Sequence, residues 1–332
     1  MPETTGKPRV FSGIQPSGGL HLGNYLGAIR NWVRDQDRHD NIFCIVDLHA
    51  ITVMQEPAAL RENTLDLAAV YLASGIKPEQ AMFVQSHVAA HSELAWIIEC
   101  FSPMGWLDRM TQFKEKSGKE RERSSAGLYT YPALMAADIL LYDTRFVPVG
   151  EDQRQHIELT RDVAQRMNQR FGDLFVLPEP MIREVGCRIM GLDDPLKKMS
   201  KSLAVTAPGH AIFMLDEPDV IRKKVARAQT DTEPAVRFPA GAGVTNLLEI
   251  YRTIKDADRG SMEAEFQGKP YSVLKNAVAE SVIEVLRPIQ ARYRQIREDD
   301  AALLQQLHRT ADRLTPLANA TLARVQEAVG LR

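Results

Sequence analysis

Two short segments of the chain carry side chains that could hold a chain of phosphates. The first, residues 13–24, reads GIQPSGGLHLGN and lies between a candidate strand at 10–12 and a helical pattern. Glycines let the backbone approach a ligand closely, and the first turn of a helix offers unpaired N–H groups to phosphate. His21 and Asn24 would reach a triphosphate or a ribose from that turn. Considered alone, the segment is explained equally well as an ordinary glycine-rich turn with a capping residue.

The second segment is residues 197–202, KKMSKS, which follow the turn-like run Asp193-Asp194-Pro195. Lysines beside a Met-Ser pair on a loop suit a clamp on the negative charge that develops on departing pyrophosphate. A solvated basic loop is the simpler interpretation of a lysine pair by itself. This segment therefore gains weight only in combination with the first.

Two further segments place polar groups among apolar ones. Residues 131–142 read YPALMAADILLY, an apolar helical pattern interrupted by Asp138. A carboxylate buried there needs a partner, because an unpaired buried charge is strongly unfavourable. Asp138 could equally lie on the helix surface or act as a buried structural hydrogen-bonder. Residues 147–156, VPVGEDQRQH, form a strand end that turns into a helix, where Glu151 and Asp152 could also be an acidic N-cap.

In order and spacing, the four segments together resemble the tryptophanyl-tRNA synthetase family of the class I aminoacyl-tRNA synthetases. HLGN stands where the class pattern reads HIGH, and KMSKS is complete; Asn24 in place of the second histidine looks like the tryptophan enzymes. The resemblance extends along essentially the whole chain. It includes residues 47–52 (DLHAIT), 110–116 (MTQFKEK) and 286–289 (LRPI).

The resemblance implies an ATP site and a set of catalytic residues. The ATP site would comprise Gln15, Pro16, Ser17, Gly23, Asn24, Gly150, Glu151, Asp152, Ile189, Lys198, Met199, Ser200, Lys201 and Ser202. The catalytic residues would be His21, Asn24, Lys116, Lys198 and Lys201, with Lys116 reaching the phosphates.

It also implies an amino-acid pocket. The pocket would be lined by Phe11, His49, Tyr131, Met135, Asp138, Val147, Val149 and Gln153. Asp138 would accept a hydrogen bond from the indole N–H, the only polar group on a tryptophan side chain. Tyr131 and Gln153 are candidates for holding the α-amino group.

The implied reaction is activation of L-tryptophan by ATP, followed by transfer to the terminal adenosine of tRNA(Trp). Mg²⁺ would be bound through ATP and not in a protein cage. A tyrosyl-tRNA synthetase is the nearest alternative, opposed by Asn24 and by residues 150–156. A small-molecule nucleotidyltransferase would not need the long helical region after residue 208. A noncatalytic paralogue is opposed by the intact His21, Lys198 and Lys201.

Short apolar runs alternate with helical patterns in the first half of the chain. Candidate strands are 10–12, 42–46, 82–84 and 146–149, and candidate helices follow at 22–33, 57–75 and 159–172. Such alternation predicts an α/β fold with a Rossmann-like, doubly wound parallel sheet, whose ligands bind beyond the carboxyl ends of the strands. Of the segments that carry chemistry, 13–24 and 147–156 lie at such strand ends, 131–142 follows a helical pattern, and 197–202 is expected on a loop.

Helical patterns dominate after residue 208. We expect breaks at Pro218, 234–243, Gly260 and 268–270, a helix at 272–297 that Pro288 ends or kinks, and a final helix at 303–329. The predicted domains are a catalytic domain at 1–207, a helical domain at 208–298 and a C-terminal helical segment at 299–332 that packs back on the catalytic domain. The helical domain would contact the anticodon, with Arg222, Lys223, Lys224 and Arg227 as candidate phosphate contacts.

Composition bounds the remaining possibilities. The formal net charge is −2, so a nucleic acid would be held by local basic patches and not by the overall field. No apolar run approaches the roughly 18 residues of a membrane span, and no signal core follows Met1, so we expect a cytoplasmic protein. Cys44 and Cys100 are interpreted as reduced, packed thiols. His87 and His91 have no evident third ligand, so we expect no protein-bound metal; a homodimer is implied by the resemblance alone.

Overall fold

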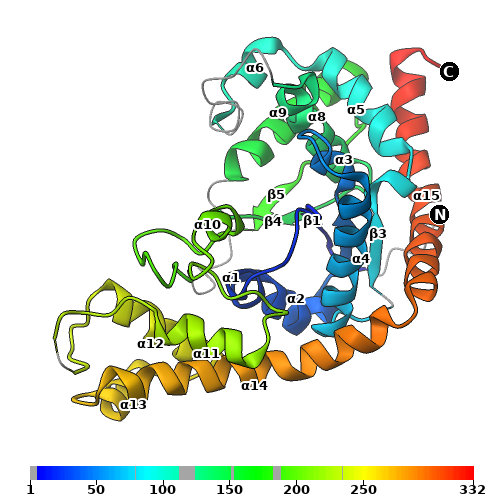
Figure 1. Ribbon diagram of the computed structural model, residues 1–332. Helices are drawn as coiled ribbons and strands as arrows, with labels where there is room; N and C mark the ends of the chain where they lie inside the picture. Colours follow the sequence, from blue (N-terminus) through cyan, green and yellow to red (C-terminus); the bar gives the residue numbers. More distant parts are fainter. Residues whose placement is uncertain (1–5, 79, 112–123, 151–152, 182–187, 234) are drawn as a thin grey trace.

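The computed structural model describes residues 6–78, 80–111, 124–150, 153–181, 188–233 and 235–332. Its centre is a five-stranded sheet in which every strand pair is parallel (Figure 1). The strands are β1 (Arg9–Ile14), β2 (Asp40–Ile45), β3 (Ala81–Val84), β4 (Phe146–Pro148) and β5 (Glu179–Met181). The predicted α/β fold with a Rossmann-like parallel sheet is confirmed.

Helices cover both faces of this sheet. The first layer comprises α1 (Leu22–Asn24), a π-helical turn (Tyr25–Ile29), α2 (Arg30–Asp35) and α4 (Pro57–Ala73). The second comprises α5 (Ala90–Phe101), α6 (Met104–Asp108), α8 (Ala126–Leu140) and α9 (Arg154–Phe171). Short helical segments are α3 (Asp47–Ala50) and the 3₁₀ turns Gln36–Arg38 and Gln85–His87.

The side chains of β2 show why this strand reads as a continuous apolar run. Phe43 and Ile45 join the core under the first helical layer, whereas Ile42 and Cys44 join the core under the second. Successive side chains of a strand point to opposite faces, so a strand covered on both sides must be apolar throughout.

The strand order β3-β2-β1-β4-β5 reverses direction at β1. The chain first builds outward from β1 through β2 to β3, then returns to the other side of β1 for β4 and β5. The connecting segments diverge where the order reverses, and this leaves a crevice beyond the carboxyl ends of β1 and β4. Two of the segments singled out in the sequence, 13–24 and 147–156, begin at these strand ends.

The rest of the chain is helical, as predicted. Its helices are α10 (Lys201–Thr206), α11 (Pro218–Ala226), α12 (Ala242–Lys255), α13 (Arg259–Phe266), α14 (Tyr271–Arg297) and α15 (Asp300–Val329). Pro288 does not end α14, whose flanking residues Leu286 and Ile289 are buried in the core. Gly260 is no break either: it lies in the first turn of α13, which the Asp258 side chain caps at the Ser261 N–H.

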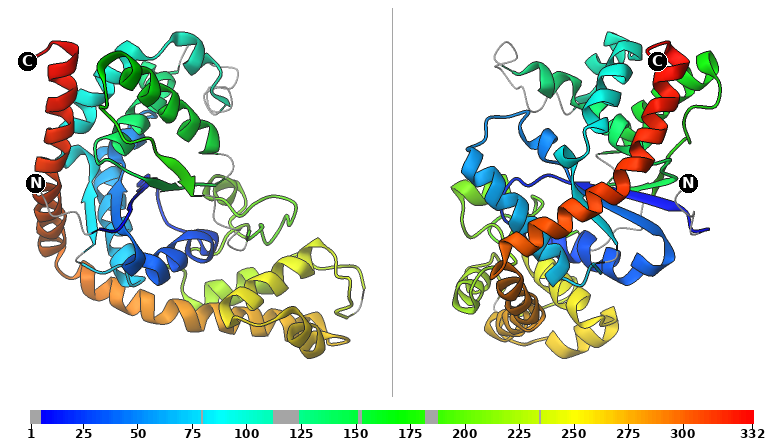
Figure 2. Two further views of the ribbon diagram at one scale, coloured as in Figure 1. Left: turned by 180° about the vertical axis from the view of Figure 1, so that it is seen from behind. Right: turned by 90° about the vertical axis from the view of Figure 1, so that its right-hand side faces the viewer.

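The last helix, α15, lies against β3 and α5 and so covers the outer edge of the sheet (Figure 2). Arg324 ties it there by donating to the Leu174 carbonyl at 3.0 Å and pairing with Asp143 at 3.1 Å. The boundaries at 207 and 298 stay predictions, because one hydrophobic core runs without interruption from Phe43 in the sheet to Val278 in α14.

The expectations about the cysteines and about membrane-spanning helices can be compared with the structure. Cys44 is buried, and burial raises the pKa of its thiol well above the ordinary value. Cys100 is exposed on α5, so its interpretation as a packed thiol is wrong. In the described parts of the chain, no helix combines the length and the apolar character that crossing a bilayer requires.

Candidate active site

A cavity of about 310 Å³ opens where β1 and β4 end. It is lined by Phe11, Gly13, Gln15, Val46, His49, Tyr131, Met135, Asp138, Ile139, Val147, Pro148, Val149, Gly150 and Gln153. Every residue predicted for the amino-acid pocket is in this lining, together with Gln15 and Gly150 from the predicted ATP set. The volume lies at the lower end of the roughly 300–1,000 Å³ common for ligand pockets, as a small rigid ligand requires.

Asp138 lies inside α8 and is only 1% exposed. Its Oδ2 is 2.8 Å from His49 Nε2, and its Oδ1 is 2.6 Å from His91 Nδ1. The Gln85 amide also donates to Oδ1 at 2.6 Å. These partners come from three other segments, α3, α5 and the turn after β3, so the carboxylate is fixed from several directions.

Two opposing effects set the charge of Asp138. Burial by itself would raise the pKa of this carboxyl, but the hydrogen bonds from His49 and His91 outweigh it and lower the pKa below its ordinary value of 3.8. Asp138 is therefore an ionised acceptor at neutral pH, with its charge compensated by donors and not by water.

A further set of contacts supports this network from behind. His91 is fully buried, and its Nε2 is 2.7 Å from Tyr142 Oη. The Tyr142 ring stacks on Phe11 with centroids 5.9 Å apart, and Phe11 lines the cavity. Gln85 and His91 hold the predicted carboxylate, yet the sequence singled out neither for this purpose. No signal in the sequence alone joins them to Asp138, because they reach it only through tertiary packing.

His87 and His91 contact different partners. His91 contacts Asp138, whereas the His87 ring stacks on His308 of α15 with centroids 4.0 Å apart. Within the described residues, no group of three or more His, Cys, Asp or Glu side chains could hold a metal ion.

The position of α8 is fixed at its N-terminus. The Ser125 hydroxyl accepts from the Leu128 N–H at 3.1 Å and donates to the Thr52 carbonyl at 2.7 Å. This cap links α8 to the loop after α3, which carries His49. One turn further on, Tyr131 places its hydroxyl 2.6 Å from His156 Nε2 of α9. The cap thereby helps to position His49 and Tyr131, which both line the cavity.

The HLGN turn forms a reciprocal cap at the start of α1. The His21 N–H donates to Asn24 Oδ1 at 3.1 Å, and His21 Nδ1 accepts from the Asn24 N–H at 3.3 Å. Because Nδ1 accepts, a neutral His21 carries its proton on Nε2. Burial is the largest cause that lowers the pKa of His21 from 6.5 to about 4, and Lys201, Lys198 and His210 lower it further. His21 is thus neutral at physiological pH.

The KMSKS segment approaches the glycine-rich turn directly. Lys201 Nζ donates to the Gly18 carbonyl at 2.8 Å and lies 3.4 Å from Ser17 Oγ. Burial lowers the pKa of Lys201. The Ser200 hydroxyl caps α10 at the Leu203 N–H. The structure therefore brings together the two motifs, which are more than half of the chain apart.

Residues 189–199 form a hairpin that presents this segment. Met190 bridges Lys198, and the buried Met199 donates through its N–H to the Ile189 carbonyl at 3.1 Å. Ile189 also lies under the HLGN turn, where a Cβ added at Gly23 would be 3.6 Å from Ile189 Cβ. The side chains of Lys198 and Ser202 are exposed. Lys116, Glu151 and Asp152 lie outside the described residues, so their predicted roles stay predictions.

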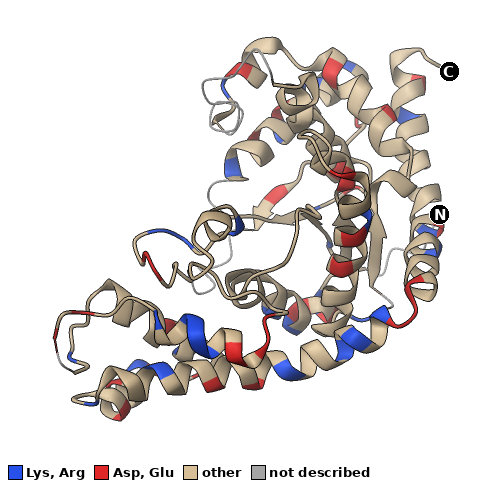
Figure 3. Ribbon diagram, viewed as in Figure 1, with Lys and Arg blue, Asp and Glu red and all other residues tan. Residues whose placement is uncertain are grey.

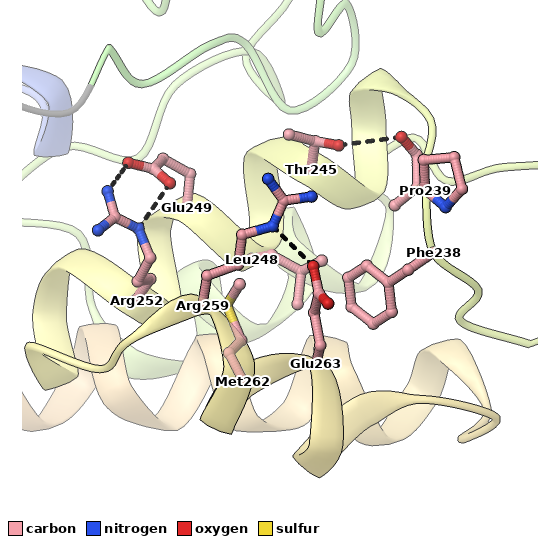
Figure 4. A pocket seen from close by; sticks show the side chains of 10 residues that line it. Phe238, Pro239, Thr245, Leu248, Glu249, Arg252, Arg259, Met262 and Glu263 are labelled. Carbon is pink, nitrogen blue, oxygen red and sulfur yellow. Dashed lines mark hydrogen bonds and ion pairs between the residues drawn. The ribbon is translucent and has the colours of Figure 1, made fainter.

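A larger cavity, of about 380 Å³, lies between α12 and α13 (Figure 4). All its lining residues come from 238–263, far along the chain from the four segments. The charges at its rim are already paired, Arg252 with Glu249 and Arg259 with Glu263. This cavity has the greater volume of the two, but polar side chains converge on the cavity around Asp138, which is therefore the candidate active site.

Basic and acidic side chains are interspersed along α11, α12 and α14 (Figure 3). Of the candidate phosphate contacts there, Lys224 is engaged within the protein: its Nζ lies 2.6 Å from Asp216 Oδ2 and 2.8 Å from the Ala211 carbonyl. Arg222 pairs with Glu280 and Asp219 on the surface. The contacts of Lys224 with Asp216 and Ala211 make it primarily a structural residue.

Comparison with known proteins agrees with this geometry. The model of the tRNA synthetases class I (W and Y) family matches residues 3–287. The tryptophan–tRNA ligase of Wolinella succinogenes is 55% identical over 327 residues, which cover 98% of this chain and 99% of the relative.

Two solved structures are similar over the whole chain. Tryptophanyl-tRNA synthetase from Campylobacter jejuni, complexed with ADP and tryptophan, superposes with a TM-score of 0.85 at 33% identity, covering 97% of this chain and 99% of that one. The enzyme from Mycoplasma pneumoniae gives 0.86 at 37% identity, covering 98% of each chain. The names of these relatives specify tryptophan, so the amino-acid substrate is tryptophan and not tyrosine. The chain therefore belongs to the class I tRNA synthetases for tryptophan and tyrosine, and its activity is the ATP-dependent ligation of tryptophan to tRNA(Trp).

Proposed function

We propose that the cavity around Asp138 holds the tryptophan side chain, and that the HLGN turn and the KMSKS segment hold ATP beside it. The observation that carries this proposal is the lining of one cavity by every residue expected from the sequence to touch tryptophan. The cavity lies at the crevice where the strand order reverses, the usual ligand site of such sheets.

Asp138 would be the residue that selects tryptophan. An ionised carboxylate has about four acceptor positions, and among the described residues His49, Gln85 and His91 use three of them. The remaining position, on Oδ2, suits an indole N–H. A site built around one buried hydrogen bond rejects an analogue that lacks the donor by roughly 10⁴- to 10⁵-fold. Phenylalanine has no such donor, and tyrosine carries its hydroxyl elsewhere.

The first reaction step would be attack by the tryptophan carboxylate on the α-phosphorus of ATP. The bond to the bridging oxygen of the β-phosphate breaks, pyrophosphate leaves, and tryptophanyl-adenylate forms. A carboxylate needs no general base, so positioning and charge stabilisation should dominate catalysis. Neutral His21 would donate from Nε2 to a phosphate oxygen, and Lys201 would exchange the Gly18 carbonyl for phosphate oxygens as charge develops.

Mg²⁺ would enter bound to ATP and neutralise part of its charge. In the second step a ribose hydroxyl of the terminal adenosine, the 2′ position by class resemblance, attacks the acyl carbon, and AMP leaves. Lys116, Glu151 and Asp152 are proposed to complete the ATP site on the resemblance alone.

Residues 1–207 are proposed as the catalytic domain, 208–298 as the helical domain that contacts the tRNA anticodon, and 299–332 as a C-terminal segment. A cytoplasmic location is proposed because the substrates, ATP and tRNA, are cytoplasmic.

A homodimer is proposed from the resemblance. Its candidate surface is on α5 and α6, where Trp96 and Met104 are 67% and 65% exposed, since large exposed apolar groups commonly mark interaction sites. Halving of the mass in Trp96→Lys by light scattering would support this surface, and an unchanged mass would remove it.

The experiment that tests the proposed pocket is pyrophosphate exchange across all standard amino acids, with wild type and Asp138→Ala. Wild type should exchange with tryptophan and not with tyrosine or phenylalanine. Asp138→Ala should lose tryptophan-dependent exchange. Equal exchange in both proteins would remove Asp138 from substrate selection.

A further inference from the structure

A stretch of backbone joins the two phosphate-binding motifs. We call residues 210–214 the strap; it runs between the hairpin 189–199 and the HLGN turn. The backbone hydrogen bonds that join it to the hairpin and the HLGN turn are Leu192 N–H to the His210 carbonyl (3.1 Å), Leu22 N–H to the Ile212 carbonyl (2.8 Å) and Met214 N–H to the Leu20 carbonyl (2.8 Å). Because the strap is bonded at both ends, its position sets the spacing between the motifs.

The strap is also fastened to the helical part of the chain. Lys224 of α11 donates to the Ala211 carbonyl at 2.8 Å, and the buried Gln290 of α14 donates to the Met214 carbonyl at 2.9 Å. These contacts hold the middle and end of the strap. The beginning of the strap is held by the side chain of His210 in addition to the backbone bond from Leu192.

The His210 ring lies under the hairpin and is 1% exposed. Its Nδ1 is 2.5 Å from Asp193 Oδ1, and its Nε2 is 3.2 Å from the main-chain carbonyl oxygen of Lys198. The ring fits only because residue 191 is glycine, since a Cβ at Gly191 would collide with it. One imidazole thus connects the turn of the hairpin with the main chain of a proposed catalytic lysine.

The partners of the ring fix how many protons it needs. A carbonyl oxygen only accepts hydrogen bonds, so Nε2 must carry a proton to bond Lys198. A carboxylate also only accepts, so a second proton must lie between Nδ1 and Asp193. If the pair keeps one proton instead of two, a lone pair faces an acceptor on one side, and either the Asp193 contact or the Lys198 contact is lost.

We propose that the doubly protonated His210–Asp193 pair is a positioning device that holds the main chain of Lys198 in place against the HLGN turn. When the pair loses a proton, Lys198 is released and adenylate formation slows. This inference rests on the proposed role of Lys198 at the phosphates. His210 itself touches no substrate and acts through Lys198.

Ionisable groups of several elements surround the ring. Asp193 and Asp194 lie on the hairpin turn: Asp193 contacts the ring, and Asp194 is near enough that His210 contributes to lowering the pKa of its carboxyl. Lys198, whose main-chain carbonyl contacts the ring, carries a positive charge on an exposed side chain. His21, at the start of α1, is close enough to sense the charge of His210 but is itself neutral above its pKa of about 4. The carboxylate of Asp193 therefore lies at Nδ1, where the second proton is needed.

The test compares wild type, His210→Ala and Asp193→Asn in tryptophan-dependent pyrophosphate exchange from about pH 5 to about pH 9, the range in which histidines change charge. In wild type, kcat should fall as the pH rises and the pair loses its proton. His210→Ala should lower kcat roughly 10- to 100-fold, with the KM for tryptophan unchanged. Asp193→Asn should retain activity and lose the alkaline fall, because an asparagine amide donates to Nδ1 of a neutral ring.

Tryptophan binding by each variant, followed by intrinsic fluorescence, shows whether the fold is intact. Asp194→Asn is the matched control, since Asp194 pairs with Lys197 and makes no hydrogen bond to His210; it should keep the alkaline fall, with its midpoint moved slightly at most. An alkaline fall that persists in Asp193→Asn overturns the proposal. So does a kcat of His210→Ala equal to that of wild type, provided that Lys198→Ala is impaired. An unimpaired Lys198→Ala would instead overturn the role of Lys198 on which the inference rests.

Discussion

The cavity around Asp138 and the phosphate side of the site are built differently. Around Asp138, side chains hold side chains: His49, His91 and Gln85 are buried and aim their donors at one carboxylate. On the phosphate side, Lys198 is exposed, and Lys201 rests on the Gly18 carbonyl.

This difference matches two separate tasks. Selecting one amino acid needs a polar group fixed in advance, because a preorganised buried hydrogen bond discriminates strongly. Stabilising charge that appears only during reaction needs cations that can exchange weak partners for phosphate oxygens. We therefore expect substitutions in the first region to change which substrate is used, and substitutions in the second to change how fast it reacts.

The largest effect is expected for Asp138→Asn. An asparagine cannot accept from all the donors around it, so kcat/KM for tryptophan-dependent exchange should fall by roughly 10⁴-fold. Stability should fall as well, since His49, His91 and Gln85 lose an ionised partner. Pyrophosphate exchange and thermal unfolding measure the two effects. If the variant still prefers tryptophan over phenylalanine by the wild-type factor, Asp138 does not select the substrate and the two regions do not have separate tasks.

Lys201→Ala is expected to act on the rate alone. Removing one cation that stabilises developing charge should lower kcat for exchange by roughly 10²- to 10³-fold. Tryptophan affinity, measured by fluorescence titration, should stay close to that of wild type because the cavity is untouched. A large loss of tryptophan affinity would show that the two regions are not separate.

His21 should make stability depend on pH. The folded pKa of about 4 lies below the ordinary 6.5, so between these values the unfolded chain binds a proton that the native state does not. Stability should thus fall as the pH drops from 6.5 to about 4, by about 3 kcal/mol in total. Urea unfolding of wild type and His21→Gln across this range measures the difference. Identical pH profiles for the two proteins would mean that His21 is not held neutral.

The smallest effect is expected for Lys197→Ala. Its ammonium pairs with Asp194 at 3.0 Å, and the side chain is 63% exposed. Exposed pairs contribute about 0–1 kcal/mol, so both exchange and stability should change little. This variant tests whether the effect of Lys201 is specific to that residue or arises from the general positive charge of the loop. A rate loss as large as that of Lys201→Ala would make the loop a diffuse electrostatic patch.

The sequence was informative where function depends on local order. The strand ends and the glycine-rich turn follow from apolar runs and glycines that are readable along the chain, whereas the cavity residues were implied by the resemblance to the synthetase family. The partners of Asp138 were harder, because Gln85 and His91 lie 53 and 47 residues away from it and meet it only through tertiary packing: Gln85 from the turn after β3, and His91 through the contact of α5 with α8. Spacing linked His91 with His87, but the two rings face different neighbours. The strap was invisible for the same reason.

Helix boundaries failed where local rules were overridden. Pro288 would end an isolated helix, yet burial of its neighbours carries α14 through it. Gly260 was interpreted as a break, but the Asp258 cap just before it starts α13. Propensity is a weak force beside packing and capping.

The central claim is that the indole N–H of the substrate meets Asp138. The most direct test uses an isosteric tryptophan analogue in which sulfur replaces the indole nitrogen, so that shape is kept and the donor is lost. Its kcat/KM in pyrophosphate exchange by wild type should be lower than that of tryptophan by roughly 10⁴-fold or more. A value within about tenfold of tryptophan, the range of a purely steric difference, would contradict the account.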